Sequence, residues 1–217
     1  GNGGITTDDF IAVINLADFT VSSTIPVAEG PDRIVENNNN LYVAHIGGYG
    51  FGNTVSVINS ATNTISQTIP VGDVPNSIKI DNGSLYVICA GKPNYSGAET
   101  AGKLVKVNLT DNTVTSTIDF PATTHPSNLG IENNVLYYTL DSRIFSTTES
   151  ATTLPTTALF ETTAEGVSAI YRFEVKNNKS YVGDAGDYSA NGKVYIYSLT
   201  GVLENNYTVG VIPAGFY

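Results

Sequence analysis

The chain has 217 residues and a formal net charge of −10, with 20 acidic side chains against 10 Lys and Arg. A binding surface for nucleic acid or anionic lipid needs clustered positive charge, so this balance argues against both kinds of partner. No apolar run reaches the roughly 18 residues that a membrane-spanning helix requires. Hydrophobic residues make up 41% of the chain, which is enough for a packed core.

The composition favours strands and turns over helices. Thr, Ser, Asn and Gly are abundant, whereas Lys and Glu, the usual residues of exposed helices, are scarce. β-branched and aromatic residues favour strands, and Asn and Gly favour turns. Met is absent and Cys89 is the single cysteine, so the chain has neither a start residue nor a disulfide partner. We therefore expect an exported, all-β protein.

A repeated segment is the strongest signal in the chain. Thr68–Pro75 reads TIPVGDVP, and Thr24–Pro31 reads TIPVAEGP. Weaker copies lie at Thr117–Pro126 and Thr208–Pro213. The copies recur at intervals of roughly 40–50 residues or twice that, and this interval is the length of one propeller blade.

Each repeat contains the same pieces in the same order. A short strand follows the proline, and an Asn-rich tight turn leads to a second strand, a third alternating strand and a fourth strand. In one repeat these pieces are Arg33–Val35, Asn37–Asn40, Leu41–Val43, Val55–Ile58 and Thr64–Ile69. Asn and Gly adopt the positive φ angles that such tight turns need. Four short strands per repeat predict a β-propeller built from four-stranded antiparallel blades.

These motifs resemble a known family. Leu-Tyr-Val at 41–43, Val-Ser-Val-Ile-Asn at 55–59 and Thr-Ile-Pro-Val-Gly at 68–72 are similar to the YVTN, or YncE-like, β-propeller repeat family. The resemblance covers nearly the whole chain, is strongest over residues 10–120 and is degraded over 140–165.

The C-terminal sequence GVIPAGFY resembles the ends of surface-layer-type propellers of Bacteroidetes. Some propellers of this group are surface lipoproteins that capture cobamides and pass them to a TonB-dependent outer-membrane transporter. The resemblance therefore implies a ligand-binding protein of the cell surface, and it carries over no individual ligand residue.

We expect one β-propeller domain of about five blade-equivalents, as either a small ring or part of a seven-bladed ring. The expected segments are a partial blade at 1–27, blades at about 28–71, 72–120, 121–165 and 166–209, and a closing strand at 210–217. Because residues 2–15 copy the sequence that follows a Leu-Tyr-Val strand, we also expect the native protein to be longer at its N-terminus.

The long connections between second and third strands are the expected functional face. They span 44–53, 90–102 and 183–192, and the connections that enter each blade emerge on the same face. Long loops on a rigid scaffold commonly bind ligands, and Tyr offers a large contact area with little loss of entropy. The predicted ligand-binding residues are Arg33, His45, Tyr49, Phe51, Lys92, Tyr95, His125, Asp184 and Tyr188.

Structural roles compete with these functional ones. His45 and His125 are equally suited to hydrogen-bond or cap neighbouring loops, and Arg33 to neutralise nearby carboxylates. Cys89 lies in a strand and is expected to be a small buried hydrophobe. The tyrosines that recur in the second strands are expected to pack between blades: Tyr86, Tyr137 and Tyr181.

No residue pattern predicts catalysis or metal binding. The two histidines with Asp184 and Asp187 match no zinc spacing, and Asp8-Asp9 matches no calcium loop. No Gly-x-Ser-x-Gly motif is present, and no sequence pattern places a serine beside either histidine. We therefore predict no catalytic residue, no bound metal and no cofactor.

Three functions remain open, and we favour the first. They are non-catalytic capture of a nutrient such as a cobamide or siderophore, a structural or protein-interaction role, and an enzyme such as a lactonase or lyase. The expected partner is a small-molecule ligand or a surface protein such as a TonB-dependent transporter. The expected location is the cell surface or the periplasm, with a lipid anchor in the outer membrane as one option.

Overall fold

The computed structural model describes residues 4–216. The chain divides into two compact units, unit 1 (residues 1–125) and unit 2 (residues 126–217). Antiparallel sheets make up both units, and the helical segments among the described residues are two single 3-10 turns, η1 (Asn94–Ser96) and η2 (Thr163–Glu165). Residues 4–216 contain no helix with the length and hydropathy that crossing a bilayer requires.

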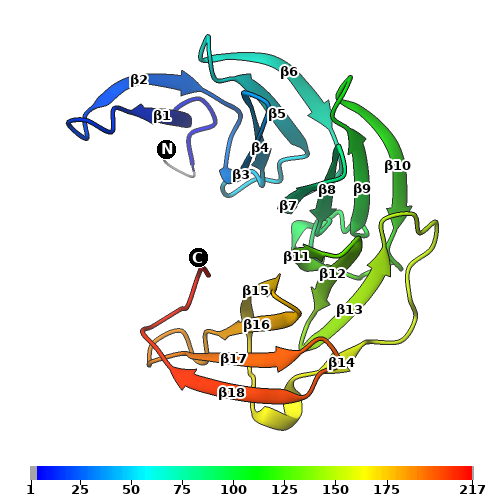
Figure 1. The fold of residues 1–217 in the computed structure, drawn as a ribbon. Coiled ribbons are helices and arrows are strands. Elements are labelled where there is room, and N and C mark those ends of the chain that lie inside the picture. The colour runs from blue at the N-terminus through cyan, green and yellow to red at the C-terminus, as the bar shows by residue number, and fades with distance from the viewer. Residues whose placement is uncertain (1–3, 217) are drawn as a thin grey trace. The chain divides into compact units, whose positions relative to one another are not determined.

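Unit 1 contains a two-stranded sheet and two four-stranded sheets (Figure 1). The two-stranded sheet pairs β1 (Phe10–Ile14) with β2 (Val21–Pro26). The first four-stranded sheet consists of β3 (Pro31–Asn37), β4 (Asn40–His45), β5 (Thr54–Asn59) and β6 (Thr64–Pro70). The second consists of β7 (Pro75–Asp81), β8 (Ser84–Cys89), β9 (Lys103–Asn108) and β10 (Thr113–Asp119). Neighbouring strands in each sheet follow the order of the sequence.

Unit 2 contains two further four-stranded sheets with the same strand order. The first consists of β11 (Ser127–Glu132), β12 (Val135–Leu140), β13 (Arg143–Thr148) and β14 (Phe160–Glu161). The second consists of β15 (Ile170–Lys176), β16 (Lys179–Asp184), β17 (Lys193–Ser198) and β18 (Leu203–Thr208). The short β14 and the long connection before it lie where the sequence repeat is degraded.

The Asn-rich turns have the expected backbone conformation. Two residues with positive φ join the first and second strands of every four-stranded sheet. These pairs are Asn38 and Asn39, Asn82 and Gly83, Asn133 and Asn134, and Asn177 and Asn178. Two consecutive positive φ angles match the twist of a two-residue hairpin, and Asn and Gly adopt them with little strain.

Each core forms between consecutive sheets within a unit. In unit 1, Tyr42 and Val57 of one sheet pack with Leu85 and Val105 of the next, and all four are buried. A smaller cluster between the two-stranded sheet and β3–β6 includes Ile25. In unit 2, the cluster includes Tyr137, Phe173 and Tyr197. Neighbouring sheets within a unit therefore pack against each other through buried apolar side chains, as stacked blades require.

The predicted fold class is confirmed. The chain is all-β and is built from four-stranded antiparallel β-propeller blades together with one two-stranded sheet. The two-stranded sheet and the four complete sheets together amount to about five blade-equivalents. The connections between second and third strands are long after β4, β8 and β16.

Candidate functional site

Two neighbouring loops of unit 1 present aromatic side chains. The β4–β5 loop (residues 46–53) carries Tyr49 and Phe51, and the β8–β9 loop (residues 90–102) carries Tyr95. Tyr49 is 87% exposed and Tyr95 is 86% exposed, whereas Phe51 is half-buried. The ring centroids of Phe51 and Tyr95 lie 6.5 Å apart, so the two loops are in contact. We call these three residues the aromatic surface.

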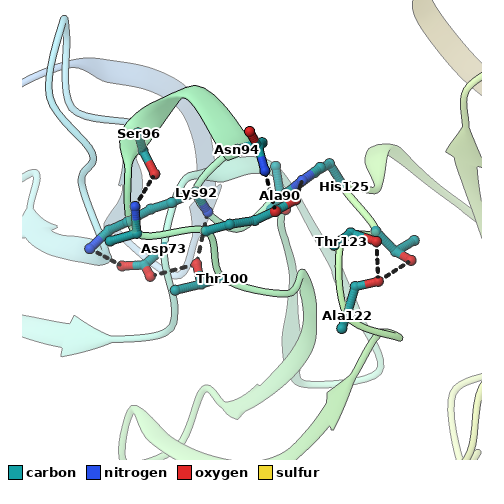
Figure 2. Close-up of polar contacts among 12 residues, drawn as sticks. Asp73, Ala90, Lys92, Asn94, Ser96, Thr100, Ala122, Thr123 and His125 are labelled. Atoms are coloured by element: carbon teal, nitrogen blue, oxygen red, sulfur yellow. Dashed lines mark hydrogen bonds and ion pairs between the residues drawn. The ribbon is translucent and has the colours of Figure 1, made fainter.

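The base of the β8–β9 loop is fixed by a network around Asp73 (Figure 2). The Thr100 hydroxyl donates to Asp73 Oδ2 at 2.9 Å, and Lys92 Nζ lies 3.7 Å from Asp73 Oδ1. The Lys92 backbone N–H donates to Thr100 Oγ1 at 2.8 Å, and the Thr100 N–H donates to the Lys92 carbonyl at 3.1 Å. Asp73 belongs to the β6–β7 connection, so the loop is joined to the preceding blade.

The tip of the same loop is also ordered by hydrogen bonds. η1 contains Tyr95 and is followed by Gly97, which adopts the left-handed conformation at φ +74°. Asn94 Nδ2 donates to Glu99 Oε2 at 3.1 Å, closing the tip across the turn. His125 lies against this tip, 2.8 Å from the Ala90 carbonyl through Nδ1 and 3.1 Å from Glu99 Oε1 through Nε2.

The β4–β5 loop is held by close backbone packing. Ile46 N–H donates to the Gly30 carbonyl at 2.8 Å, and Gly52 N–H donates to the Ile46 carbonyl at 2.9 Å. Val74 N–H donates to the Gly52 carbonyl at 2.7 Å, which joins the loop to the next blade. A Cβ at Gly30 would lie 2.3 Å from the Gly48 nitrogen, so only glycine permits this approach. Phe51 therefore lies on a loop that is held by hydrogen bonds to Gly30 at one end and to Val74 at the other.

Two other predicted residues, His45 and Arg33, contact polar side chains and are not part of the aromatic surface. His45 is 1% exposed, and its Nε2 lies 2.9 Å from Ser56 Oγ on the paired strand β5. Burial lowers the pKa of His45, although a hydrogen bond with the Ala28 backbone and the charge of Asp9 oppose that change. Arg33 is half-buried in β3, and its Nε lies 3.3 Å from Asp32 Oδ2. His45 is therefore enclosed, whereas the Arg33 side chain is partly exposed.

The predicted residues of unit 2 form a separate group. Asp184 is 5% exposed, and its Oδ1 accepts hydrogen bonds from Ser168, Ala169 and the Gly186 N–H. Tyr188 is 52% exposed and packs edge-on against Tyr171, with ring centroids 6.1 Å apart. Asp184 therefore holds the segment before β15 against the β16–β17 loop. Of the two predicted residues Asp184 and Tyr188, only Tyr188 has an accessible side chain.

Unit 2 also has a pocket that the sequence did not indicate. Its volume is about 370 Å³, and it lies between β17, β18 and the C-terminal segment. Its lining is mainly apolar and includes Val194, Tyr207, Pro213 and Phe216. None of the predicted ligand-binding residues lines it.

The described residues include one buried thiol and no cluster of metal-binding side chains. Cys89 is fully buried, and burial raises the pKa of its thiol to about 12. No group of three or more His, Cys, Asp or Glu side chains within residues 4–216 is placed to hold a metal ion.

The structure brings together four of the predicted residues and several that were not predicted. Phe51 and Tyr95 meet directly, and Lys92 and His125 hold the loop that carries Tyr95. The unpredicted partners in this network are Asp73, Asn94, Glu99 and Thr100. Asp73 had a detectable signal, because the repeat places Glu29 at the equivalent position, whereas Asn94, Glu99 and Thr100 lie in an insertion without a counterpart.

Several solved structures of differently named proteins have a similar fold, at low sequence identity to this chain. Hydrazine synthase of Kuenenia stuttgartiensis has a TM-score of 0.61 at 15% identity, over 83% of this chain and 49% of that one. BamB from Moraxella catarrhalis has a TM-score of 0.55 at 13% identity, over 94% and 62%. Hsv2 of Kluyveromyces lactis has a TM-score of 0.55 at 9% identity, over 97% and 63%. These likenesses show the propeller fold alone.

The match to each of these structures covers about half to 63% of the solved chain. No curated protein is significantly similar to the chain in sequence. Residues 1–212 match the family described as "Domain of unknown function (DUF5074)".

Proposed function

The chain belongs to the DUF5074 family, and from this premise we propose that it is a non-catalytic binding protein whose ligand docks on the aromatic surface. The ligand lies over Tyr49, Phe51 and Tyr95, where two blades of unit 1 meet. One observation carries this proposal: two nearly fully exposed tyrosines stand on loops that the protein holds in place with many hydrogen bonds.

Rigid exposed aromatic side chains favour binding for two physical reasons. Each ring offers a large contact area, and Tyr adds a hydroxyl for hydrogen bonding. A loop that is already ordered loses little conformational entropy when a ligand binds, so more of the contact energy appears as affinity. The network around Asp73 and the bonds to His125 supply this order in the β8–β9 loop.

The charges around the aromatic surface define the ligand class. Asp73 and Lys92 pair with each other, Glu99 contacts His125, and the whole chain carries a net charge of −10. A polyanion is therefore disfavoured. A ligand with an extended flat face and neutral polar groups suits the rings and the neighbouring amide and hydroxyl groups. A cobamide, with its corrin ring and amide side chains, has this chemistry, and some siderophores share part of it.

Our proposal places this binding at the cell surface. The ligand would be a nutrient that the protein captures and delivers to a TonB-dependent outer-membrane transporter. The acidic surface supports solubility in an exposed location. The similarity of the repeats to surface propellers supports the same location.

Calorimetry with cyanocobalamin tests the proposal. We expect binding by the wild-type chain and a loss of at least tenfold in affinity for Tyr95→Ala, because an anchor aromatic side chain commonly contributes about 2 kcal/mol or more. Tyr207→Ala is the matched control, since Tyr207 is also an exposed tyrosine but belongs to β18 of unit 2. Absence of heat at micromolar protein overturns the cobamide assignment, and equal losses in both variants overturn the assigned surface.

A protein-interaction role is the second candidate, and a specific surface favours it. The two-stranded sheet and its hairpin expose large apolar side chains: Phe10, Ile14, Leu16, Phe19 and Val21. Contiguous exposed apolar groups commonly mark contact surfaces. Under this alternative, Phe10→Ser weakens a stable complex isolated from outer membranes, whereas Tyr95→Ala leaves that complex intact.

A further inference from the structure

The imidazole of His125 lies between two hydrogen-bond acceptors. Nδ1 is 2.8 Å from the Ala90 carbonyl oxygen, and Nε2 is 3.1 Å from Glu99 Oε1. A carbonyl oxygen only accepts hydrogen bonds, and so does an ionised carboxylate. Both ring nitrogens must then carry a proton for both contacts to be hydrogen bonds.

We propose that His125 is an imidazolium that positions the β8–β9 loop and its exposed Tyr95, so that the aromatic surface is ordered only while His125 is protonated. His125 does not touch the ligand in this proposal and acts through Glu99. The consequence for ligand affinity rests on the proposed function. The protonation state of His125 and the order of the β8–β9 loop are independent of the proposed function.

Glu99 has the ionisation state that this arrangement needs. Asn94 Nδ2 donates to its second oxygen at 3.1 Å. The hydrogen bond from Asn94 and then the one from His125 hold the pKa of Glu99 below its ordinary value of 4.5. The carboxylate is therefore charged at neutral pH, and His125 supplies its positive partner.

The other charges near the loop have partners of their own. Lys92 pairs with Asp73 at the base of the loop, and Lys103 of β9 pairs with Asp119 of β10. Glu99 is the charged group in contact with the His125 ring on the facing loop. Loss of the proton from His125 therefore leaves Glu99 without its cationic partner.

The contacts of His125 connect the segment after β10 to both ends of the β8–β9 loop. Ala90 begins the β8–β9 loop, Glu99 lies near its end, and Asn94 starts η1, the turn that contains Tyr95. His125 belongs to the segment after β10. Deprotonation at Nε2 replaces a charge-assisted hydrogen bond by a lone pair facing a carboxylate, which is repulsive. The tip of the loop then loses its attachment to this segment.

The sign of the pH dependence follows from these contacts. The bridge requires a protonated imidazole, so its stabilisation is present while Nε2 carries its proton and is lost at the higher pH at which that proton leaves. At the acid end, the bridge is lost as the pH falls through the Glu99 titration, below 4.5. Loop order should therefore be greatest between these two limits.

The second histidine supplies an internal reference. His45 is buried, and burial lowers the pKa of its ring. Burial therefore favours the neutral form of the His45 ring. The chain has only these two histidines, so two sets of imidazole signals are expected.

Nitrogen NMR of the imidazole rings tests the protonation state of the full chain between pH 4.5 and 9. We expect two protonated ring nitrogens for His125 wherever the loop is protected, and one for the buried His45. In parallel, hydrogen exchange measures protection of the Gly97 and Thr100 amides, corrected for the intrinsic exchange rate at each pH. We expect protection to fall about tenfold as His125 loses its proton, the loss of one charge-assisted hydrogen bond.

Glu99→Gln distinguishes a charge effect from a merely structural one. The Gln amide can donate to a neutral imidazole at Nε2, so the bridge persists without a charged ring. We expect loop protection that no longer varies between pH 5 and 8, whereas His125→Ala loses protection throughout that range. Overturning results are a neutral His125 ring while the wild-type loop is protected, or an unchanged pH profile in Glu99→Gln.

The ligand experiment separates the two proposals. If cyanocobalamin binds, its affinity for the wild-type chain should fall with loop protection as the pH rises, and Glu99→Gln should remove this dependence. If cyanocobalamin does not bind but the NMR and exchange results hold, His125 is confirmed as a positioning residue and the cobamide assignment fails. If it binds with a pH-independent affinity while loop protection changes, binding at this aromatic surface does not depend on His125.

Discussion

Phe51 and Tyr95 belong to loops of neighbouring blades, and their ring centroids lie 6.5 Å apart. The contact is tilted, with an angle of 44° between the ring planes. Such a pair leaves part of each ring available to a third aromatic or flat group. The junction between two blades therefore carries a surface that neither blade forms alone.

The Thr100 hydroxyl should be essential for the order of the β8–β9 loop. It donates to Asp73 and accepts from the Lys92 N–H, so Thr100→Val removes both hydrogen bonds at similar side-chain volume. We expect a loss of about 1–3 kcal/mol in the free energy of unfolding. Urea denaturation monitored by circular dichroism measures it.

Thr100→Ser is the control for this prediction. It retains the hydroxyl and removes only a methyl group, so its effect on stability should be smaller than that of Thr100→Val. Equal losses in the two variants would show that packing of the methyl group, and not hydrogen bonding, stabilises this part of the loop.

Gly30 should tolerate substitution much less well than Gly83. Both have positive φ, +66° and +69°. A Cβ at Gly30 would lie 2.3 Å from the Gly48 nitrogen, whereas a Cβ at Gly83 would meet no atom within 4 Å. Gly83→Ala should cost about 1 kcal/mol for backbone strain alone. Gly30→Ala should cost several times as much, because the β4–β5 loop must also move.

Thermal unfolding of the two alanine variants measures this difference, and Gly83→Ala serves as the control for strain without a clash. Similar melting temperatures in both variants would contradict the close approach of Gly30 to Gly47 and Gly48. Because the β4–β5 loop carries Phe51, Gly30→Ala should also weaken any binding at the aromatic surface.

The sequence predicted those features of the fold that repeat. The alternating strands and the Asn turns recur in every blade, and each depends on local chemistry: burial of one strand face and positive φ at residues such as Asn38 and Asn39. The lone Cys89 was expected to be a buried hydrophobe, and it is fully buried. Repetition gave several independent examples of the same local preference.

The polar network of the β8–β9 loop could not be predicted in this way. Thr100 bonds to Asp73 across 27 positions in the sequence, and Glu99 to His125 across 26. No repeat contains these pairs, and the residue types alone do not indicate which residues are partners. Such contacts depend on how adjacent blades stack, which the pattern within one blade does not specify. His45 illustrates the same point, since only the structure shows that it is enclosed beside Ser56.

The Tyr42 hydroxyl should stabilise the junction between two blades of unit 1. Tyr42 is 1% exposed, and its hydroxyl donates to Asn112 Oδ1 on the next blade at 2.9 Å. Tyr42→Phe keeps the packed ring and removes this bond, which should cost about 1 kcal/mol in the free energy of unfolding. Tyr207→Phe is the matched control, because Tyr207 is 54% exposed and should change stability little. Equal effects would show that the bond to Asn112 contributes nothing specific.

Cys89 should be unreactive in the folded chain. It has no exposed surface, and burial raises the pKa of its thiol to about 12, so the reactive thiolate is scarce at pH 8. We expect labelling with a disulfide reagent such as Ellman's reagent to proceed no faster than opening of the fold, and to become fast in denaturant. Rapid labelling of the native chain would contradict burial of this residue within the core of unit 1.

The raised thiol pKa also predicts an alkaline loss of stability. Below pH 9.0, the ordinary value, the thiol is protonated in both folded and unfolded chains and contributes no pH dependence. Between pH 9.0 and about 12, only the unfolded chain releases this proton, so the free energy of unfolding should fall as the pH rises. Burial also raises the pKa of Tyr42 and Tyr137 above the ordinary 10.0, so these side chains lower stability in the same direction as the pH rises, and Cys89→Ala provides the comparison. The wild-type chain should lose stability more steeply than Cys89→Ala, and parallel slopes in urea denaturation at pH 8 to 11 would contradict the prediction.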